Sequence, residues 1–258
     1  METALHVRFI PLEDCGLQVR EPGEGQTESR RVDGRPIIFG VRSRNLTPWS
    51  DDRVVYEVLE AGCISPDLIQ RSDILLNINH STKVTDILGR RRNGQGTLDL
   101  NLRESYVEAS CDLPRTNCAN DTLELIKRGD ITGMSFAFSD DYMDSENGVS
   151  YERTGEIHDG KEVWLRHVKR ITGLYDVSIV THPAYEQTSV GTREQGDAID
   201  KAIEDQLKRE TANEQHEETD LEREERELEE QAEKARIMMT QRLRSQRRHL
   251  AENFINQL

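Results

Sequence analysis

The sequence lacks the segments that carry a chain into or across a membrane. None of its apolar runs approaches the roughly 18 residues that a transmembrane helix needs, and its first residues, METALHVRFIPLED, do not join a basic region to an apolar one. We therefore expect neither a transmembrane helix nor a signal peptide. The formal net charge of −15 disfavours nucleic acid or an anionic membrane as a main partner, because both repel an acidic surface.

Cysteine is scarce, and its spacing does not indicate a metal site. Cys15, Cys63, Cys111 and Cys118 form no C-x-x-C pair, and the last two lie seven residues apart, which matches no common zinc spacing. We interpret the four as reduced thiols of a cytosolic protein and expect no metal or organic cofactor. A thiol peptidase that uses Cys63 or Cys118 stays open as an alternative.

Charge is distributed unevenly along the chain. Residues 194–234 carry 17 acidic and 6 basic side chains, whereas residues 235–258 carry 5 basic and 1 acidic. Residues 197–252 contain neither proline nor glycine and are rich in glutamate, arginine and glutamine. This composition predicts one or two long helices, which form a charged C-terminal tail.

The tail has only a weak coiled-coil pattern. Leu221, Leu228 and Ala235 are spaced by seven residues, as are Leu243 and Leu250, but the two series are out of phase by one residue. Most intervening core positions are polar. A solvated single helix and a helix that self-associates or binds a partner both remain open.

The part of the chain before the tail is rich in predicted strands. A polar segment, REPGEGQTESRR, follows the apolar alternation of Leu5, Val7 and Phe9 and predicts a flexible arm or loop. A helix is predicted over 117–128 with Gly129 as its stop, and an acidic surface excursion over 139–160. Short apolar runs bounded by turn residues predict strands at 36–43, 54–60, 74–79, 97–102, 106–113, 134–139, 163–169 and 173–181.

One of these strands carries a candidate nucleophile. In GDITGMSFAF, residues 129–138, the apolar Met134, Phe136 and Phe138 alternate with Ser135 and Ala137, so the serine should lie on the other face of the strand. His80 ends the apolar run LLNINHS, and Asp176 lies within YDVSIVTHPAY. Serine, imidazole and carboxylate are the groups of a nucleophile, base and orienting acid.

Other residues compete for the supporting roles. His158, His167 and His182 are rival third members, and the chemistry alone does not choose among them. Arg166 and Arg170 could stabilise an oxyanion, although a salt bridge is the more common role of such arginines. No G-x-S-x-G elbow surrounds Ser135, which disfavours another class of acyl hydrolase.

The ordered set of motifs resembles the prohead maturation protease family of tailed bacteriophages. The matching segments span roughly residues 34–190 and are VYEVLEAGCI, LLNINHS, LGR, GDITGMSFAF and YDVSIVTHPAY. The resemblance implies that His80 is the base and Ser135 the nucleophile. The family usually has glutamate where this chain has Asp176, so the carboxylate is kept but shortened by one methylene.

The resemblance also implies a fold and a biological role. The family is similar to the herpesvirus capsid assembly protease, which implies an α+β fold with a small β-barrel flanked by helices and a Ser-His-His triad. We therefore expect an N-terminal arm over 1–33, a serine protease domain over 34–193 and the helical tail over 194–258. The expected function is cleavage of scaffold and capsid protein N-terminal segments, and of the protease itself.

The expected location is the inside of the immature capsid in the host cytoplasm. The acidic and basic halves of the tail could bind capsid or scaffold surfaces by charge complementarity.

The main alternative to a protease is a non-enzymatic scaffolding protein. It is favoured by the charged, proline-poor tail and disfavoured by a strand-rich domain that a pure scaffold would not need.

Overall fold

The computed structural model describes residues 5–25, 27–131, 133–181 and 196–211, and five single residues of the C-terminal segment: Leu228, Gln231, Arg236, Met238 and Met239. The chain divides into two compact units, Met1–Lys201 and Ala202–Leu258. Residues 196–211 are helical. Within the described residues, no helix is long and apolar enough to cross a membrane. The heptad positions other than Leu228 lie outside the described residues.

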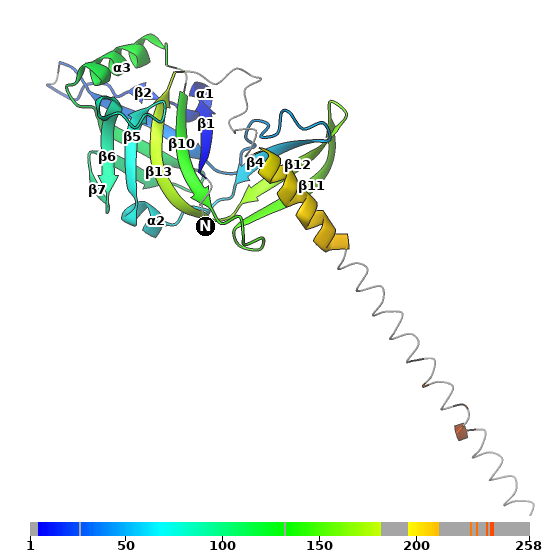
Figure 1. The fold of residues 1–258 in the computed structure, drawn as a ribbon. Helices are drawn as coiled ribbons and strands as arrows, with labels where there is room; N and C mark the ends of the chain where they lie inside the picture. The colour runs from blue at the N-terminus through cyan, green and yellow to red at the C-terminus, as the bar shows by residue number, and fades with distance from the viewer. Residues whose placement is uncertain are drawn as a thin grey trace, which may run out of the picture. The chain divides into compact units, whose positions relative to one another are not determined.

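The first unit contains a six-stranded sheet, which lies in the left-hand part of Figure 1. Its strand order is β1-β10-β13-β5-β6-β7, with β13 parallel to β5 and the other neighbours antiparallel. Asn93 and Gly94, both with positive φ (48° and 75°), make the turn between β6 and β7. The strands are β1 His6–Pro11, β10 Gly133–Asp140, β13 Ile171–Val180, β5 Asp73–Ile78, β6 Ile87–Arg92 and β7 Gln95–Gly96.

Two smaller sheets complete the strands of the first unit. A four-stranded antiparallel sheet has the order β2-β3-β9-β8, and a three-stranded sheet has the order β11-β12-β4, with β12 parallel to β4. The strands are β2 Gln18–Val19, β3 Arg31–Ile38, β9 Tyr106–Asp112, β8 Leu98–Leu102, β11 Val149–His158, β12 Lys161–Val168 and β4 Arg53–Leu59.

The strand orders confirm the α+β class but not the expected β-barrel. The terminal strands of the six-stranded sheet, β1 and β7, do not pair with each other, and the remaining strands belong to separate sheets. Among the described residues no sheet therefore closes on itself. The physical reason is that closure needs a continuous ladder of hydrogen bonds around all strands, which this pairing does not provide.

Few helices accompany the sheets. The helix predicted over 117–128 is α3, Asn117–Arg128, where Thr116 accepts a hydrogen bond from the backbone N–H of Ala119 and Gly129 ends the helix at φ 80°. Pro66 begins the helix α2, Pro66–Arg71, and Ser65 caps it. The other short helices are α1 Leu12–Cys15 and the 3₁₀ turn η1 Val84–Asp86.

The acidic segment predicted as a surface excursion is half strand. Residues 141–148 consist mainly of turns, but Val149–His158 is β11. Most β11 residues are exposed, and the strand pairs on one side only, with β12. An exposed edge strand needs no apolar alternation, so the periodicity that revealed the other strands was missing here.

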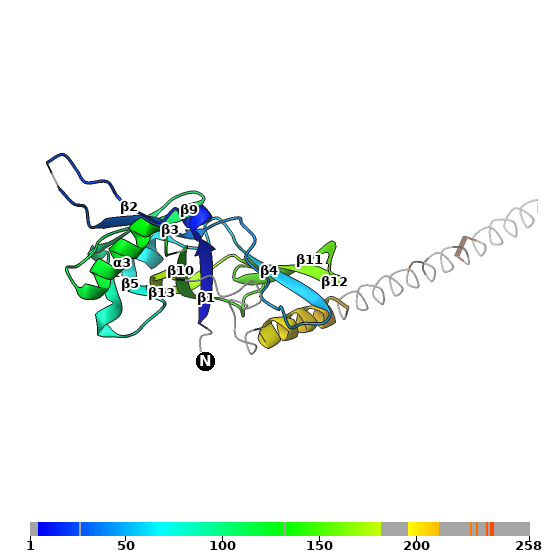
Figure 2. The same cartoon turned by 90° about the horizontal axis from the view of Figure 1, so that it is seen from above.

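The N-terminal residues also contribute to the sheets. β1 pairs with β10 over six residue pairs, from His6↔Phe138 to Pro11↔Gly133, and β2 pairs with β3. Residues 21–30, by contrast, contain no strand or helix in their described part, in agreement with the loop predicted for REPGEGQTESRR. Figure 2 shows β1 from above, beside β10.

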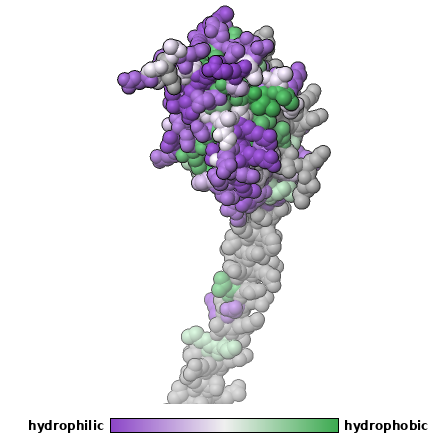
Figure 3. Space-filling model, turned by 90° about the vertical axis from the view of Figure 1, so that its left-hand side faces the viewer, coloured by the Kyte–Doolittle hydropathy of each residue, from purple (hydrophilic) through white to green (hydrophobic). Residues whose placement is uncertain are grey.

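The core of the first unit surrounds β10, which is buried along its whole length. Phe136 and Phe138 are fully buried with ring centroids 5.2 Å apart. β3 lies close to this strand at Gly34, where an added Cβ would lie 2.4 Å from the Met134 sulfur, so a side chain here would displace the end of Met134. The described surface is mostly hydrophilic on the face in Figure 3, with hydrophobic residues gathered in a small area.

Candidate functional site

Ser135 lies in the middle of β10, between β1 and β13. Its backbone is opposite Phe9 on one side and Ser178 on the other. The predicted alternation holds, because side chains on a strand point in turn to opposite faces. Ser135 is 2% exposed. A hydroxyl at this position is fixed by two neighbouring strands, which suits a group that must be held in one orientation.

His80 follows β5 in a strained turn. Asn79 and His80 both have positive φ, 50° and 55°, a conformation that is unfavourable for residues with side chains. The turn is tied to β13, because the Asn79 N–H donates to the Ile179 carbonyl (3.1 Å) and the His80 N–H donates to the Ser178 hydroxyl (2.9 Å). These bonds direct the imidazole toward the six-stranded sheet.

The structure brings the three predicted residues together. His80 Nε2 lies 2.6 Å from Ser135 Oγ, and His80 Nδ1 lies 2.7 Å from Asp176 Oδ1. Asp176 is on β13, the strand between β10 and β5, so the imidazole lies across β13. The side chains of His80 and Asp176 are 23% and 15% exposed. The arrangement can move a proton from the hydroxyl to the imidazole while the carboxylate fixes the ring.

Two groups that the sequence did not reveal complete these contacts. Ser135 Oγ lies 2.8 Å from the carbonyl oxygen of Arg8 on β1, which is a second hydrogen-bond acceptor beside the imidazole. Ser178, which supports the turn at His80, also donates to the Asn77 carbonyl at 3.3 Å. Ser178 is two residues from Asp176, so strand alternation could have placed it on the same face. A backbone carbonyl leaves no trace in a sequence.

The rival histidines lie elsewhere or are not described. His167, on β12, contacts Glu60 (2.6 Å) and Glu152 (2.9 Å) instead of His80. The imidazole of His158, on β11, lies 2.8 Å from the Tyr56 hydroxyl and is more than half exposed. His182 lies outside the described residues.

The two candidate thiols are poor nucleophiles. Burial raises the pKa of Cys63 to about 12, and Cys63 is 2% exposed. Burial also raises the pKa of Cys118, with a smaller contribution from Asp86. A thiol attacks as the thiolate, so a raised pKa disfavours the thiol peptidase alternative.

A buried ionic cluster lies on the other face of β1 and β10. It consists of Arg8 on β1, Glu57 on β4, Arg166 on β12 and Asp140 on β10, and we refer to these four residues as the ionic cluster. Arg8 binds both oxygens of Glu57 at 2.6 and 2.7 Å, and Arg166 pairs with both Glu57 and Asp140. The predicted salt-bridging role of Arg166 is thus observed; Arg170 pairs with Asp141 and Asp144.

Burial and charge both act on the titration of this cluster. Burial alone would raise the pKa values of Glu57 and Asp140, but His6 and Arg166 hold the pKa of Asp140 at about 2, and Arg8 and Arg166 hold the pKa of Glu57 below its usual range. The two carboxylates therefore stay ionised at neutral pH.

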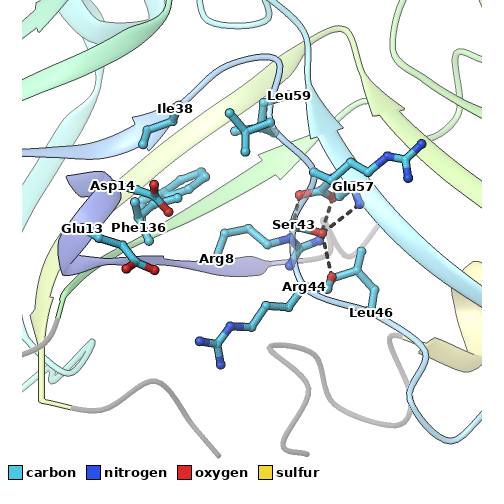
Figure 4. A pocket seen from close by; sticks show the side chains of 13 residues that line it. Arg8, Glu13, Asp14, Ile38, Ser43, Arg44, Leu46, Glu57, Leu59 and Phe136 are labelled. Atoms are coloured by element: carbon cyan, nitrogen blue, oxygen red, sulfur yellow. Dashed lines mark hydrogen bonds and ion pairs between the residues drawn. The ribbon is translucent and has the colours of Figure 1, made fainter. Parts of the chain in front are cut away.

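A cavity of about 300 Å³ borders the ionic cluster. Arg8, Glu57 and Phe136 line it, as Figure 4 shows. Because Phe136 follows Ser135 on β10, the cavity lies on the face of the strand away from the serine. It is therefore separate from the contacts of His80, Ser135 and Asp176.

Metal ligands do not gather in the described part of the chain, where no three His, Cys, Asp or Glu side chains are placed to hold an ion.

A family model described as caudovirus prohead serine protease matches residues 16–202 of the chain. No match is found among curated proteins.

Among solved structures, the chain is similar to the bacteriophage T4 capsid assembly protease. The two sequences are 13% identical, the alignment covers 71% of this chain and 100% of the other, and the TM-score is 0.41. A TM-score this low supports no conclusion about fold or function. The family assignment therefore rests on the family model alone.

Proposed function

Because the chain belongs to the caudovirus prohead serine protease family, we propose that Ser135 is the nucleophile of this serine peptidase, His80 its base and Asp176 the acid that orients the base. Family membership makes the protein a peptidase of capsid maturation. The observation that carries the assignment of residues is the continuous chain of short contacts, 2.6 Å from Ser135 to His80 and 2.7 Å from His80 to Asp176.

The proposed reaction has two steps. His80 Nε2 accepts the Ser135 proton while Oγ attacks the scissile carbonyl carbon, and the resulting imidazolium then protonates the leaving amine. An acyl-enzyme and a shortened peptide result. In the second step His80 takes a proton from water, the hydroxide attacks the ester, and the proton returns to Ser135.

Asp176 contributes orientation and charge. Its carboxylate accepts a hydrogen bond from His80 Nδ1–H, which leaves the Nε2 lone pair directed at Ser135 and stabilises the imidazolium once it forms. The pairing Ala137↔Asp176 between β10 and β13 determines the position of Asp176 along its strand relative to Ser135. The shorter carboxylate therefore reaches the imidazole directly from the neighbouring strand.

We infer the substrates from the family. Cleavage of scaffold and capsid protein N-terminal segments, and of the chain itself, inside the immature capsid fits a prohead peptidase. The division into an arm, a protease domain and a tail stays a prediction.

The charged tail would bind capsid or scaffold surfaces, or associate with another copy. Removing residues 197–258 should therefore reduce incorporation of the enzyme into capsids.

Intact-mass analysis tests the nucleophile directly. The wild type and Ser135→Ala are purified alone and after co-expression with the capsid protein, and each is also incubated with a fluorophosphonate, which reacts with activated serines. We expect defined truncation products and one phosphonate adduct in the wild type, and neither in Ser135→Ala.

Ser139→Ala is the matched control. Ser139 is on the same strand and is also buried, but its hydroxyl lies 3.0 Å from the hydroxyls of Thr172 and Tyr175 and contacts no imidazole. The control should keep both reactions. Cleavage or labelling that persists in Ser135→Ala would contradict the assignment, and an uncut capsid protein in every sample would favour the scaffolding alternative.

A further inference from the structure

The N-terminal strand β1 is in direct contact with the proposed nucleophile. β1 is one of the two edge strands of the six-stranded sheet and pairs along the side of β10 that does not face β13. The family match begins at residue 16, after β1 ends. The contact is therefore made by a part of this chain to which the family match assigns no role.

The chemistry of the contact is a competition for one proton. A serine hydroxyl has a single hydrogen to donate. Ser135 Oγ has two acceptors within reach, His80 Nε2 at 2.6 Å and the Arg8 carbonyl oxygen at 2.8 Å. When the hydrogen points to the carbonyl, the imidazole cannot accept it, and the base is not engaged.

The same carbonyl opposes the reactive form of the serine. As Oγ loses its proton it gains negative charge, and a carbonyl oxygen carries partial negative charge of its own. Two such oxygens less than 3 Å apart, in a site from which most water is excluded, repel each other. The Arg8 carbonyl thus stabilises the neutral hydroxyl and destabilises the developing alkoxide.

The side chain of Arg8 fixes the carbonyl in this position. Its guanidinium makes a two-bond contact with Glu57, and Glu57 is held in turn by Arg166 (Figure 4 shows Arg8 and Glu57). Arg8 is only 5% exposed. On the same strand, His6 Nε2 lies 3.3 Å from Asp140. Side-chain contacts therefore attach β1 directly to β4 and β10, in addition to its ladder, and Glu57 links it indirectly to Arg166 on β12.

We propose that Arg8 is a positioning residue that holds Ser135 in a resting state, and that displacement of β1 raises the reactivity of the serine. The proposal rests on the proposed function, because it requires Ser135 to be the nucleophile. It also assigns the ionic cluster a role in the activity of the enzyme. Because the cluster holds Arg8 in place, it keeps the Arg8 carbonyl oxygen hydrogen-bonded to the Ser135 hydroxyl.

The test measures the rate of phosphonate labelling of Ser135 by intact mass, with the full chain, Arg8→Ala, Arg8→Lys and a chain that lacks residues 1–11. We expect the limiting rate at saturating probe to rise about tenfold in Arg8→Ala and in the truncated chain, as the loss of one hydrogen bond to the ground state allows. The half-saturating probe concentration should not change. Arg8→Lys, which keeps a cation beside Glu57, should rise less.

Arg20→Ala is the matched control. Arg20 also makes a two-bond contact, with Asp33 at 2.7 and 2.8 Å, but it is exposed and does not contact Ser135. Its labelling rate should equal that of the wild type. Adding a synthetic peptide of residues 1–12 to the truncated chain should slow labelling again, whereas a scrambled peptide should not.

The outcomes separate this proposal from the proposed function. If Ser135 is labelled in the full chain and the two β1 variants, confirmed as folded by thermal melting, react at the same rate or more slowly, the proposal is wrong and the nucleophile stands. If the truncated chain does not fold, the Arg8→Ala and Arg8→Lys rates decide. If no variant is labelled at Ser135, both proposals fail.

Discussion

The two faces of β1 and β10 carry two polar groups of opposite character. On one face, His80 and Asp176 are partly exposed, at 23% and 15%, and form a linear chain of contacts to one hydroxyl. On the other, the side chains of the ionic cluster are at most 6% exposed and form a network of four charges that balance. The first arrangement can exchange protons with water, whereas the second cannot.

This difference indicates that the same residue type serves different purposes on the two faces. Asp176 holds one ring nitrogen in place, and its loss would leave a histidine that can still contact water. Asp140 neutralises a buried guanidinium, and its loss would leave a charge with no solvent to compensate it. Substituting each aspartate in the same way should therefore affect catalysis in one case and stability in the other.

The largest effect is expected for Asp176→Asn. The amide cannot stabilise the imidazolium and favours the wrong tautomer of His80, so the labelling rate and capsid cleavage should fall by about 10⁴-fold. Asp176→Glu, which keeps the carboxylate, should retain more activity than Asp176→Asn. Labelling rates measured by intact mass test both variants. An Asp176→Asn enzyme within tenfold of the wild type would remove Asp176 from the proposed triad.

Asp140→Asn should instead destabilise the fold. The substitution leaves Arg166 with one carboxylate partner in place of two, and breaking a buried pair of this kind costs about 3–5 kcal/mol of unfolding free energy. Urea denaturation followed by circular dichroism measures the loss. Asp176→Asn is the matched control, because its partly exposed site should change the unfolding free energy far less.

Acid should also lower the unfolding free energy, because it protonates Asp140. Its folded-state pKa is about 2, below the usual 3.8, so its contribution to stability is complete above about pH 4 and is lost as the pH falls toward 2. The shift corresponds to roughly 2 kcal/mol. Asp140→Asn should show less loss of stability than the wild type over this interval; equal losses would assign the acid sensitivity to other carboxylates.

The sequence predicted the residues of one face and, apart from the salt bridge of Arg166, missed the other. Ser135, His80 and Asp176 follow or interrupt apolar runs, and a polar side chain in an apolar strand is visible as a break in alternation. The residues of the ionic cluster are spread over four strands, and Arg8 lies in a segment predicted as an arm. Pairing across such distances depends on strand order, which local periodicity does not contain.

The fold was predictable to a similar extent. Strands with one buried face, such as β5 and β13, and the capped helix α3 have local signals that tertiary packing did not override. β11 is exposed, so its sequence has no apolar face to detect. The barrel was inferred from a resemblance, and whether strands close into a ring is decided by pairings between distant segments such as β1 and β10.

The smallest effect is expected at Ser178, whose hydroxyl contacts only backbone groups near the site. Its hydroxyl accepts the His80 N–H and so helps to keep Asn79 and His80 in their unfavourable positive-φ conformation. Ser178→Ala removes one hydrogen bond of about 1 kcal/mol and should lower the labelling rate by about five- to tenfold. Ser178→Thr keeps the hydroxyl and should restore most of the rate. A labelling rate unchanged in Ser178→Ala would mean that the bond between Asn79 and Ile179 is enough to hold the turn.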